Sequence, residues 1–467
     1  MQSLHSCVQG PGIGLKALVN KENNRVIFAE SDEDFIDVLF SFLTIPMGTI
    51  FKLIHNKSPT AGIGCMDNLY KSIMNLDEQQ FRTEACKTML LHPRNAAEVE
   101  CKRLKLNIDD DEPPKYFLCD SRDCRLSGNK LLSHYRNAVC GCGEHMGFEM
   151  VLSKKESKGR VFDARDRGVF LKGLTRFIIT DALEVMPASI ESSHSLLYAL
   201  QVTDGKNIEE HSFYIGVDKV LTLLKHSLIA EALLTKTLLE QNPEPESGKE
   251  DFCCSRYAKS RKAPASNARA SEDFVDLLFS FLTVPLGYIA KEMCNTFGGC
   301  ISHLYKSVEK LDTEQFLKSC KHKEMLLSPK LAPDFSYENH PLSIEEDIHP
   351  PYYYELGYKS VGELKSDKPF IGHYSTLTVM DPTSHFKEAT SGGFLTGPAK
   401  FTVTDNLIIT PISPIKCLSL LNKLEVSLND VKECVVRVGY EEALKLLLAS
   451  FVSESALTNA FLREANP

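Results

Sequence analysis

The chain has 467 residues, of which 43% are hydrophobic and 25% are charged, and its formal net charge at pH 7 is −9. The length is greater than one hydrophobic core supports, so we expect two or three domains. The acidic balance argues against non-specific nucleic-acid binding, which depends on clustered lysine and arginine.

The N-terminal residues predict a β-hairpin followed by a buried helix. Residues 15–19 and 25–29 are short, largely apolar runs separated by five polar residues, which is typical of two antiparallel strands and their turn. Ser31 is the expected N-cap of the helix, with an acidic residue three positions later. Apolar side chains cover nearly every face of this helix and only Asp37 and Ser41 interrupt them, so we expect the helix to be almost fully buried.

Three segments of the chain occur twice. The first match has 13 identical positions of 18, and the second has 10 of 18. The third predicts a strand that ends in a Thr-Asp turn. Such self-similarity indicates an internal duplication. The matching pairs are residues 33–50 with 272–289, residues 64–81 with 299–316, and residues 177–187 with 401–411.

Two apolar stretches in the duplicated segment are similar to short membrane segments. Residues 38–51 and 277–290 are each 14 residues long and uncharged, whereas a helix needs about 20 apolar residues to cross a bilayer. We therefore expect buried core and no membrane association. The first 14 residues lack the basic start and apolar core of a secretory signal, so we expect a cytoplasmic or nuclear protein.

The predicted fold class is α+β, with two tandem repeats of one unit of mixed helix and antiparallel sheet. We expect the first repeat over residues 13–240 and the second over residues 271–467. Residues 241–270 are rich in Pro, Glu, Ser, Lys and Arg without an apolar period, which indicates a flexible linker. No apolar hairpin precedes the buried helix of the second repeat, so this repeat either borrows a strand or is incomplete.

The one candidate site is a group of four cysteines within 24 residues, arranged as a C-x4-C pair and a C-x-C pair. Thiolates are soft donors that suit tetrahedral zinc, and two ligand pairs can hold a short loop in place of a hydrophobic core. We therefore predict a structural zinc ion as cofactor, in a zinc-ribbon-like insertion over about residues 115–150. The predicted metal ligands are Cys119, Cys124, Cys140 and Cys142.

The C-x-C spacing is tighter than is usual for zinc, although Gly141 and Gly143 would relieve backbone strain there. His134 and His145 are reserve ligands. The alternative is four reduced cysteines in a loop, because a chain without a secretory signal is expected to keep its thiols reduced. A zinc ion with four thiolate ligands has no position left for substrate, so its role would be structural. The second repeat lacks the cluster.

No catalytic or cofactor-binding motif is found: a Walker loop, H-E-x-x-H, G-x-S-x-G and the kinase motifs are all missing. Residues 109–112 are four consecutive acids that could hold a cation, but beside a Pro-Pro pair they are typical of a solvated loop. These features favour a non-enzymatic interaction or regulatory module with a protein partner.

Two other functions stay open. A zinc-stabilised nucleic-acid-associated protein would need a basic face around the cysteines. An enzyme of unknown class would need a pocket with converging titratable groups. The residues that would form the basic face are Arg122, Arg125, Lys130 and Arg136.

Several short motifs occur together in this chain. They are V-I-F-A-E at residues 26–30, L-F-S-F-L at 39–43 followed by P-x-G, the two Thr-Asp strand ends, C-G-C-G at 140–143 and A-L-T at 456–458. This combination resembles the plant family catalogued as domain of unknown function 674, over nearly the whole chain. The resemblance implies a plant origin and a duplicated domain, and it implies no activity.

Overall fold

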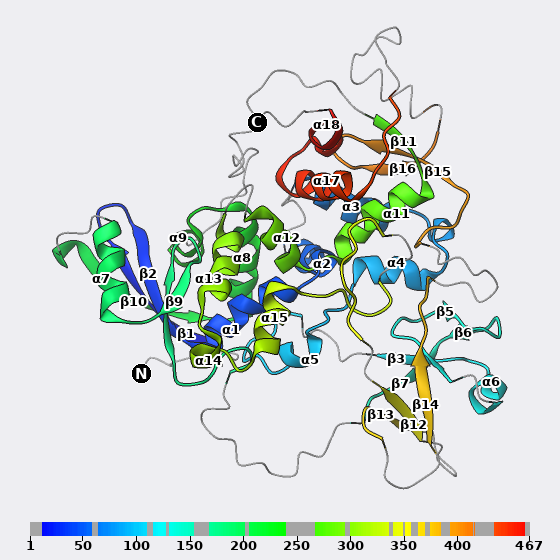
Figure 1. The fold of residues 1–467 in the computed structure, drawn as a ribbon, viewed down its shortest axis with the longest axis horizontal. Helices are drawn as coiled ribbons and strands as arrows, with labels where there is room; N and C mark the ends of the chain where they lie inside the picture. The colour runs from blue at the N-terminus through cyan, green and yellow to red at the C-terminus, as the bar shows by residue number, and fades with distance from the viewer. Residues whose placement is uncertain are drawn as a thin grey trace, which may run out of the picture.

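A computed structural model of the chain has two antiparallel sheets separated by a central group of helices, and a third, small β region to one side (Figure 1). The structure describes residues 12–57, 64–109, 115–127, 130–153, 168–200, 205–239, 267–294, 299–335, 340–348, 351–355, 363–368, 374–383, 393–413, 415 and 434–462.

The first part of the chain forms a five-stranded antiparallel sheet of order β10-β1-β2-β8-β9. Its β1–β2 hairpin is the one predicted from residues 15–29. Buried residues alternate with more exposed ones along β1, as a half-buried strand requires. Strand β10 comes from far along the chain and pairs with β1, from Ile13 opposite Ile215 to Asn20 opposite Ile208. The strands are β1 (Ile13–Asn20), β2 (Arg25–Asp32), β8 (Arg176–Thr180), β9 (Val185–Pro187) and β10 (Ile208–Ile215).

The predicted buried helix follows β2, and every residue from 35 to 51 is buried. The prediction of Ser31 as its N-cap is wrong, because β2 continues through Asp32, which is itself the N-cap. Ser31 pairs with Phe177 in β8 and its hydroxyl donates to the carbonyl of Gly14, so sheet pairing takes this residue away from the helix. The elements are α1 (Glu33–Ser41), η1 (Phe42–Thr44) and α2 (Met47–Lys57).

The second copy of this segment forms the same succession of elements, and residues 275–287 are all buried. The strand before it, β11, includes the last residues of the predicted linker, and the other linker residues lie outside the described ones. Strand β11 joins a three-stranded antiparallel sheet of order β11-β15-β16. The elements are β11 (Asn267–Ser271), α11 (Glu272–Ser280), η5 (Phe281–Thr283), α12 (Leu286–Met293), β15 (Lys400–Thr404) and β16 (Ile409–Pro411).

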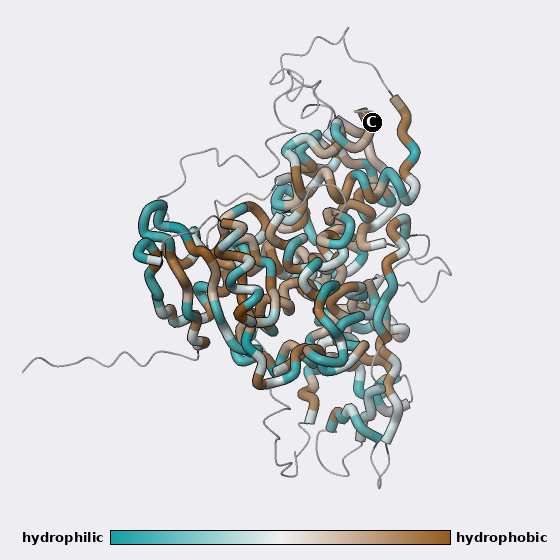
Figure 2. The backbone as a smooth tube through the Cα atoms, turned by 60° about the vertical axis from the view of Figure 1, so that its left-hand side comes forward, coloured by the Kyte–Doolittle hydropathy of each residue, from teal (hydrophilic) through white to brown (hydrophobic). Residues whose placement is uncertain are grey.

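Most of the remaining helices fill the space between the sheets or cover their ends, and α6 belongs to the small β region. One hydrophobic cluster runs through both sheets and the central helices, and apolar segments pass through the middle of the molecule in Figure 2. No helix among the described residues is long and apolar enough to cross a membrane. The helices are α3 (Gly64–Asn75), η2 (Glu78–Gln80), α4 (Glu84–Leu91), α5 (Glu98–Cys101), α6 (Arg122–Ser127), α7 (Ile190–Ala199), η4 (Gly205–Asn207), α8 (Val217–Ile229), α9 (Leu233–Leu238), α13 (Cys300–Lys310), α14 (Thr313–Phe316), α15 (Cys320–Leu327), α17 (Tyr440–Val452) and α18 (Ala456–Phe461).

The small β region, which we call the β module, combines distant parts of the chain. Its parallel pair β4–β14 joins Leu131 to Thr378. A separate apolar cluster forms part of its core, and other residues such as Phe117 and Met146 belong to the large central cluster. The fold is thus confirmed as mixed helix and antiparallel sheet, whereas the repeat arrangement and the zinc-ribbon-like insertion stay predictions. Besides α6, the β module contains β3 (Tyr116–Leu118), β4 (Leu131–Leu132), β5 (Ala138–Val139), β6 (His145–Met146), β7 (Phe148–Met150), β12 (Tyr352–Glu355), β13 (Glu363–Lys365) and β14 (Tyr374–Val379).

Candidate metal centre

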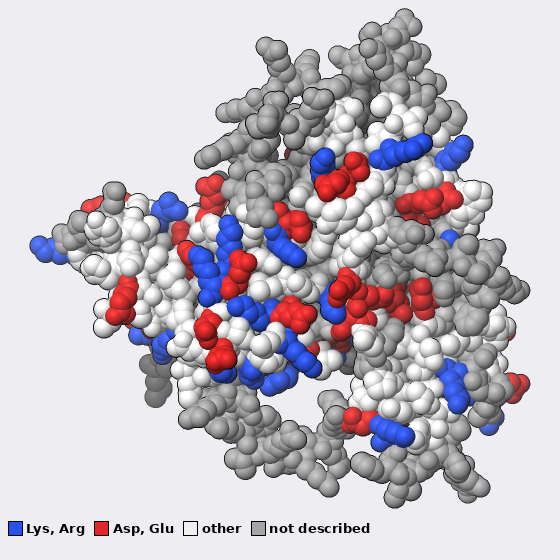
Figure 3. Space-filling view, in the orientation of Figure 1, with Lys and Arg blue, Asp and Glu red and all other residues white. Residues whose placement is uncertain are grey.

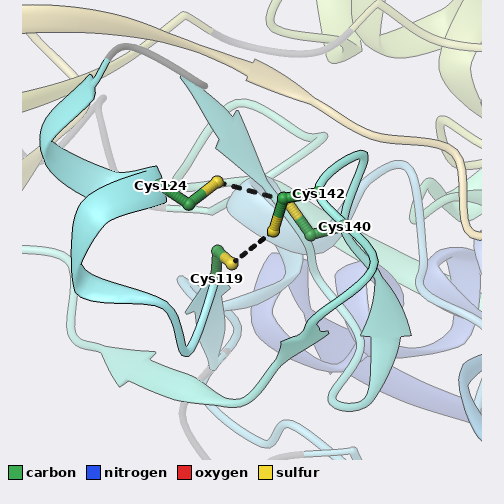
Figure 4. A group of neighbouring side chains, drawn as sticks. All are labelled: Cys119, Cys124, Cys140 and Cys142. Atoms are coloured by element: carbon green, nitrogen blue, oxygen red, sulfur yellow. Dashed lines mark hydrogen bonds between the residues drawn. The ribbon is translucent and has the colours of Figure 1, made fainter.

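Three pieces of the β module bring the four predicted cysteine ligands together (Figure 4). Cys119 directly follows β3, and Cys124 lies in the first turn of α6. Cys140 and Cys142 lie in the turn between β5 and β6, which pair as an antiparallel hairpin. The ligand pairs therefore come from separate segments, and an ion held between them would join these segments.

The four sulfurs are close enough to share one ion. The Sγ atoms of Cys119 and Cys142 are 3.4 Å apart, and those of Cys124 and Cys140 are 3.6 Å apart. All four Sγ atoms lie within 4.8 Å of one another, and all four cysteines are reduced. Zinc–sulfur bonds of about 2.3 Å at tetrahedral angles place sulfurs about 3.8 Å apart. The Cys119–Cys142 and Cys124–Cys140 distances lie slightly below this value and all others are at most 4.8 Å, so the cluster fits a tetrahedral thiolate site.

The backbone turn that carries Cys140 and Cys142 is fixed by hydrogen bonds and by one glycine. Cys140 N donates to the carbonyl of Glu144, and Gly143 N donates to the carbonyl of Cys140, at 2.8 Å each. Gly143 has a φ of +94°, which L side chains rarely adopt. Gly141 has no positive φ. Of the two glycines predicted to relieve strain, Gly143 is therefore required by its backbone conformation and Gly141 is not.

The thiols differ in exposure and in acidity. Cys119, Cys124 and Cys140 are buried, whereas Cys142 is exposed. Burial raises the pKa of Cys119, and it raises the pKa of Cys140 to about 11. A hydrogen bond from the backbone N–H of Glu144 lowers the pKa of Cys142. Buried thiolates need a compensating charge, which a divalent cation supplies because it is bound by the deprotonated form.

Arg125 fixes the segment between the first two cysteines. Its guanidinium donates to the backbone carbonyls of Cys119 and Asp120 and lies 4.1 Å from the ring centre of Phe148 in β7. These contacts fix the chain immediately after Cys119 against a strand of the module. Arg125 is also one of the residues that would form the basic face of a nucleic-acid-associated protein. Its guanidinium is already engaged by these contacts within the module.

Neither of the reserve histidine ligands belongs to the cluster, which consists of the four cysteines. His134 lies edge-on to the rings of Tyr116 and Tyr352, with ring centres 5.6 and 5.8 Å away. His145 is an exposed residue of β6. A closed set of four sulfur ligands needs neither imidazole.

The β module also depends on the second half of the chain. The rings of Tyr116 and Tyr352 lie 5.3 Å apart, between β3 and β12. Both tyrosines belong to the small apolar cluster, together with Leu377 from β14. The part of the second half that lacks cysteines therefore packs against the cysteine-containing part of the first.

The other sequence candidates have structural contacts. The Asp181 carboxylate accepts from Thr235 N and Oγ1, both at 2.8 Å, and Asp405 accepts from Thr458 N and Oγ1 at 2.8 and 2.9 Å. Each Thr-Asp turn thus anchors a short helix, α9 or α18, which agrees with the expected turn chemistry. Of the acidic residues 109–112, the structure describes Asp109 alone, and it lies 3.7 Å from Lys52 Nζ.

Sequence reasoning missed two buried carboxylates as binding groups. Asp37 and Asp276 are 1% and 3% exposed. Asp37 accepts hydrogen bonds from the backbone N–H groups of three successive residues, 169 to 171, and Asp276 accepts from those of residues 394 and 395. The signal was present in the sequence, because both copies of the apolar helix carry an acid at this position.

Burial raises the pKa of each of these carboxyl groups to about 7, although the backbone N–H donors act in the opposite direction. The sequence also gave no indication of the buried pair His340 Nε2 and Ser280 Oγ, 2.7 Å apart. Ser280 Oγ donates to the carbonyl of Leu277, and His340 Nδ1 accepts from Leu342 N. His340 Nε2 is therefore the donor to Ser280, the reverse of what a catalytic base requires.

A family model described as "Protein of unknown function (DUF674)" matches residues 9–441. No curated protein and no solved structure matches the chain.

Proposed function

The chain belongs to the DUF674 family, and we propose that it is a non-enzymatic interaction module of the cytoplasm or nucleus that holds one structural zinc ion. Cys119, Cys124, Cys140 and Cys142 are the proposed ligands. The observation that carries the proposal is the convergence of their four Sγ atoms within 4.8 Å. When bound, zinc supplies a positive charge that stabilises the thiolates and joins their segments.

The composition of the β module supports a structural role for the ion. Among the described residues its separate apolar cluster has seven buried members, and the cysteine-bearing segments reach the large central cluster only at its edge, through residues such as Phe117 and Met146. A core of this size supplies little stability, and small domains commonly add a metal or a disulfide. Zinc would connect β3 and α6 to the β5–β6 hairpin, as a zinc-ribbon-like insertion does. Four thiolates would fill the coordination sphere, so substrate binding at the metal has no place in the proposal.

The proposal includes two copies of one α+β unit. The duplicated segments form α1, η1 and α2 in the first half and α11, η5 and α12 in the second. Asp37 and Asp276 occupy the same position in these segments, and each binds backbone N–H groups of the loop before a sheet strand. A plant origin is a further expectation from the resemblance described above.

A role in nucleic-acid binding receives less support. On the face shown in Figure 3, lysine and arginine of the described residues are mixed with aspartate and glutamate, and no broad basic surface forms there. Arg125, one of the four residues expected to form such a surface, is engaged within the β module. We therefore favour a protein partner.

The test of zinc binding uses the full chain purified under reducing conditions without chelator. Elemental analysis by mass spectrometry should give about one zinc per chain for the wild type. The double variant Cys140→Ser, Cys142→Ser should contain no zinc. The matched control is Cys320→Ser, Cys434→Ser, which changes two exposed cysteines outside the cluster and should retain zinc. A wild-type chain without zinc would overturn the metal site.

Partner binding is tested by affinity capture, in which the wild type, the cluster variant and the exposed-cysteine control each serve as bait. Enrichment of a protein by wild type and by the exposed-cysteine control, but not by the cluster variant, would assign partner binding to the β module. Equal enrichment by all three would exclude the β module as the binding surface. The two measurements are separate, so the zinc site and the partner are supported or rejected independently.

A further inference from the structure

The two halves of the chain cross where the copies of the duplicated segment meet. Pro46 and Pro285, which hold the same position in the two copies, face each other in an antiparallel bridge. The residue after each proline donates a backbone hydrogen bond to the residue before the other proline, with N···O distances of 3.0 and 2.9 Å. Interchanging the copies reproduces the contacts, so the crossing has local two-fold symmetry.

Beyond this crossing, helices of each half lie on the other half. We call α3–α4 (residues 64–91) the N-arm and α13–α15 (residues 300–327) the C-arm. In the N-arm, α3 contacts α17 and β16 of the second half. In the C-arm, α13 contacts α8 and β9 of the first half, as Figure 1 also shows. Each arm therefore covers an edge strand of the sheet and a long helix of the opposite half.

Matched hydrogen bonds join each arm to the opposite sheet. Val185 N in β9 donates to Ser307 Oγ in the C-arm at 2.8 Å. Ile409 N in β16 donates to Ser72 Oγ in the N-arm at 3.0 Å. The two serines correspond in the second duplicated block, and the two donors correspond in the third. One interaction thus occurs twice, each time between halves.

A second matched pair involves buried cysteines at the start of each arm. Cys300 Sγ donates to the carbonyl of Ala230 at 3.0 Å, and Cys65 Sγ donates to the carbonyl of Ser453 at 2.9 Å. Both acceptors end a long helix, α8 or α17. These cysteines lie outside the metal cluster, and their contacts assign them to the contact between halves.

The two buried carboxylates act at the same boundary. Asp37 holds the loop of residues 168–172, which makes two backbone hydrogen bonds of 2.9 Å with residues 316–318. Asp276 holds the corresponding loop of the second half, which makes backbone hydrogen bonds of 3.0 and 2.8 Å with residues 80–82. Each carboxylate therefore orders a loop of its own half for pairing with the other half.

We infer that the chain is a covalently joined exchange dimer, in which each half contributes its arm to the core of the other. The binding partner that these surfaces fit is the opposite half of this chain. The inference rests on the proposal of two copies of one unit and is independent of zinc. A separate half would expose both its arm and the surface that receives an arm, so neither half carries a complete core.

The first test uses a matched pair of small substitutions, Ser307→Ala and Ser72→Ala. Ser307→Ala removes the acceptor of Val185 N, so the Val185 amide should exchange with deuterium roughly fivefold faster while Ile409 is unchanged. Ser72→Ala should accelerate exchange at Ile409 and leave Val185 unchanged. A change in amide deuterium exchange only within the half that carries the substitution, or no change at all, would overturn the inference that the halves contribute arms to each other. Zinc content should stay at the wild-type value in both variants.

The second test cuts the folded full chain. A specific protease site placed in residues 241–266 allows cleavage after folding, with the uncut protein as control. We expect the fragments to co-elute at the volume of the uncut chain and to unfold in one cooperative transition. Separation into two folded fragments, or two independent transitions, would overturn the inference. Metal analysis of the cut protein then reports on zinc independently of this outcome.

Discussion

The central core and the β module are stabilised in different ways. The core buries complete phenylalanine side chains such as Phe40 and Phe279, both 0% exposed, in a cluster that extends through both halves. The β module has a small apolar cluster of its own and four converging thiols, and it joins the central cluster through a few residues such as Phe117 and Met146. Burial of apolar surface suffices where many residues pack together, whereas a small group of short strands needs another source of stability. In our proposal zinc is that source.

The largest effect is expected from the core. Phe40→Ala should lower the free energy of unfolding by about 3–5 kcal/mol, because it removes a fully buried ring and leaves a cavity. Phe279→Ala changes the corresponding residue of the second copy and should cost a similar amount. Urea denaturation measures both. Zinc content at native conditions should not change, and a loss of zinc in either variant would contradict the separation of core and module.

A second effect concerns the charge buried in the core. The pKa of Asp37 rises from 3.8 to about 7 on burial, so folding favours the protonated carboxyl. Its stabilising contribution is fully present below pH 4 and is lost as the pH rises to about 7. The difference is on the order of 4 kcal/mol, from about three pKa units at 1.36 kcal/mol each.

Asp37→Asn removes this titration. Measured by urea denaturation from pH 4 to pH 8, the wild type should lose stability relative to the variant as the pH rises. Asp276→Asn should behave in the same way, because burial raises the pKa of Asp276 to about 7 as well. Parallel pH profiles of wild type and variants would show that these carboxylates keep their ordinary pKa values. The β module should not contribute to the difference in pH dependence between the wild type and these variants.

The smallest effect is expected in the β module. Gly143→Ala places a side chain at a φ of +94°, at a cost of about 1–2 kcal/mol. This strain should weaken zinc binding about tenfold, as measured by competition with a chelating dye. Gly141→Ala is the matched control, since Gly141 has no positive φ, and it should bind zinc nearly as wild type does. Equal weakening by both would show that the turn conformation does not control the site.

The sequence predicted the structure correctly where the local residue pattern agrees with the environment of those residues in the folded chain. The largely apolar runs on either side of residues 20–24 predicted the hairpin, and the apolar surface around Asp37 predicted a buried helix. Cysteine spacing alone identified all four members of the cluster, because ligands close together in sequence tend to be close in space. The Ser31 cap failed because pairing with β8 extends β2 through Asp32, and a long-range strand contact of this kind leaves no local signal.

The relation between the halves could not be predicted from the duplication. Matching segments show that an element is repeated, and they do not show which sheet each arm covers. Ser72 and Ser307 look like ordinary polar residues in amphipathic helices, and their partners lie more than 100 positions away. The role of Asp37 was hidden for the same reason: its donors are at residues 169–171, across a sequence separation of more than 130 residues.

The order in which the chain leaves the ribosome gives the crossed arms a further consequence. The C-arm, which covers β9 and α8, is synthesised after all strands of the first sheet. The N-arm waits longer, because β16 and α17, which it contacts, come much later in the chain. At about 5–20 residues per second, apolar surface of the N-terminal half stays uncovered for on the order of tens of seconds. Nascent chains of this protein are therefore expected to need chaperone protection until β16 and α17 have been synthesised.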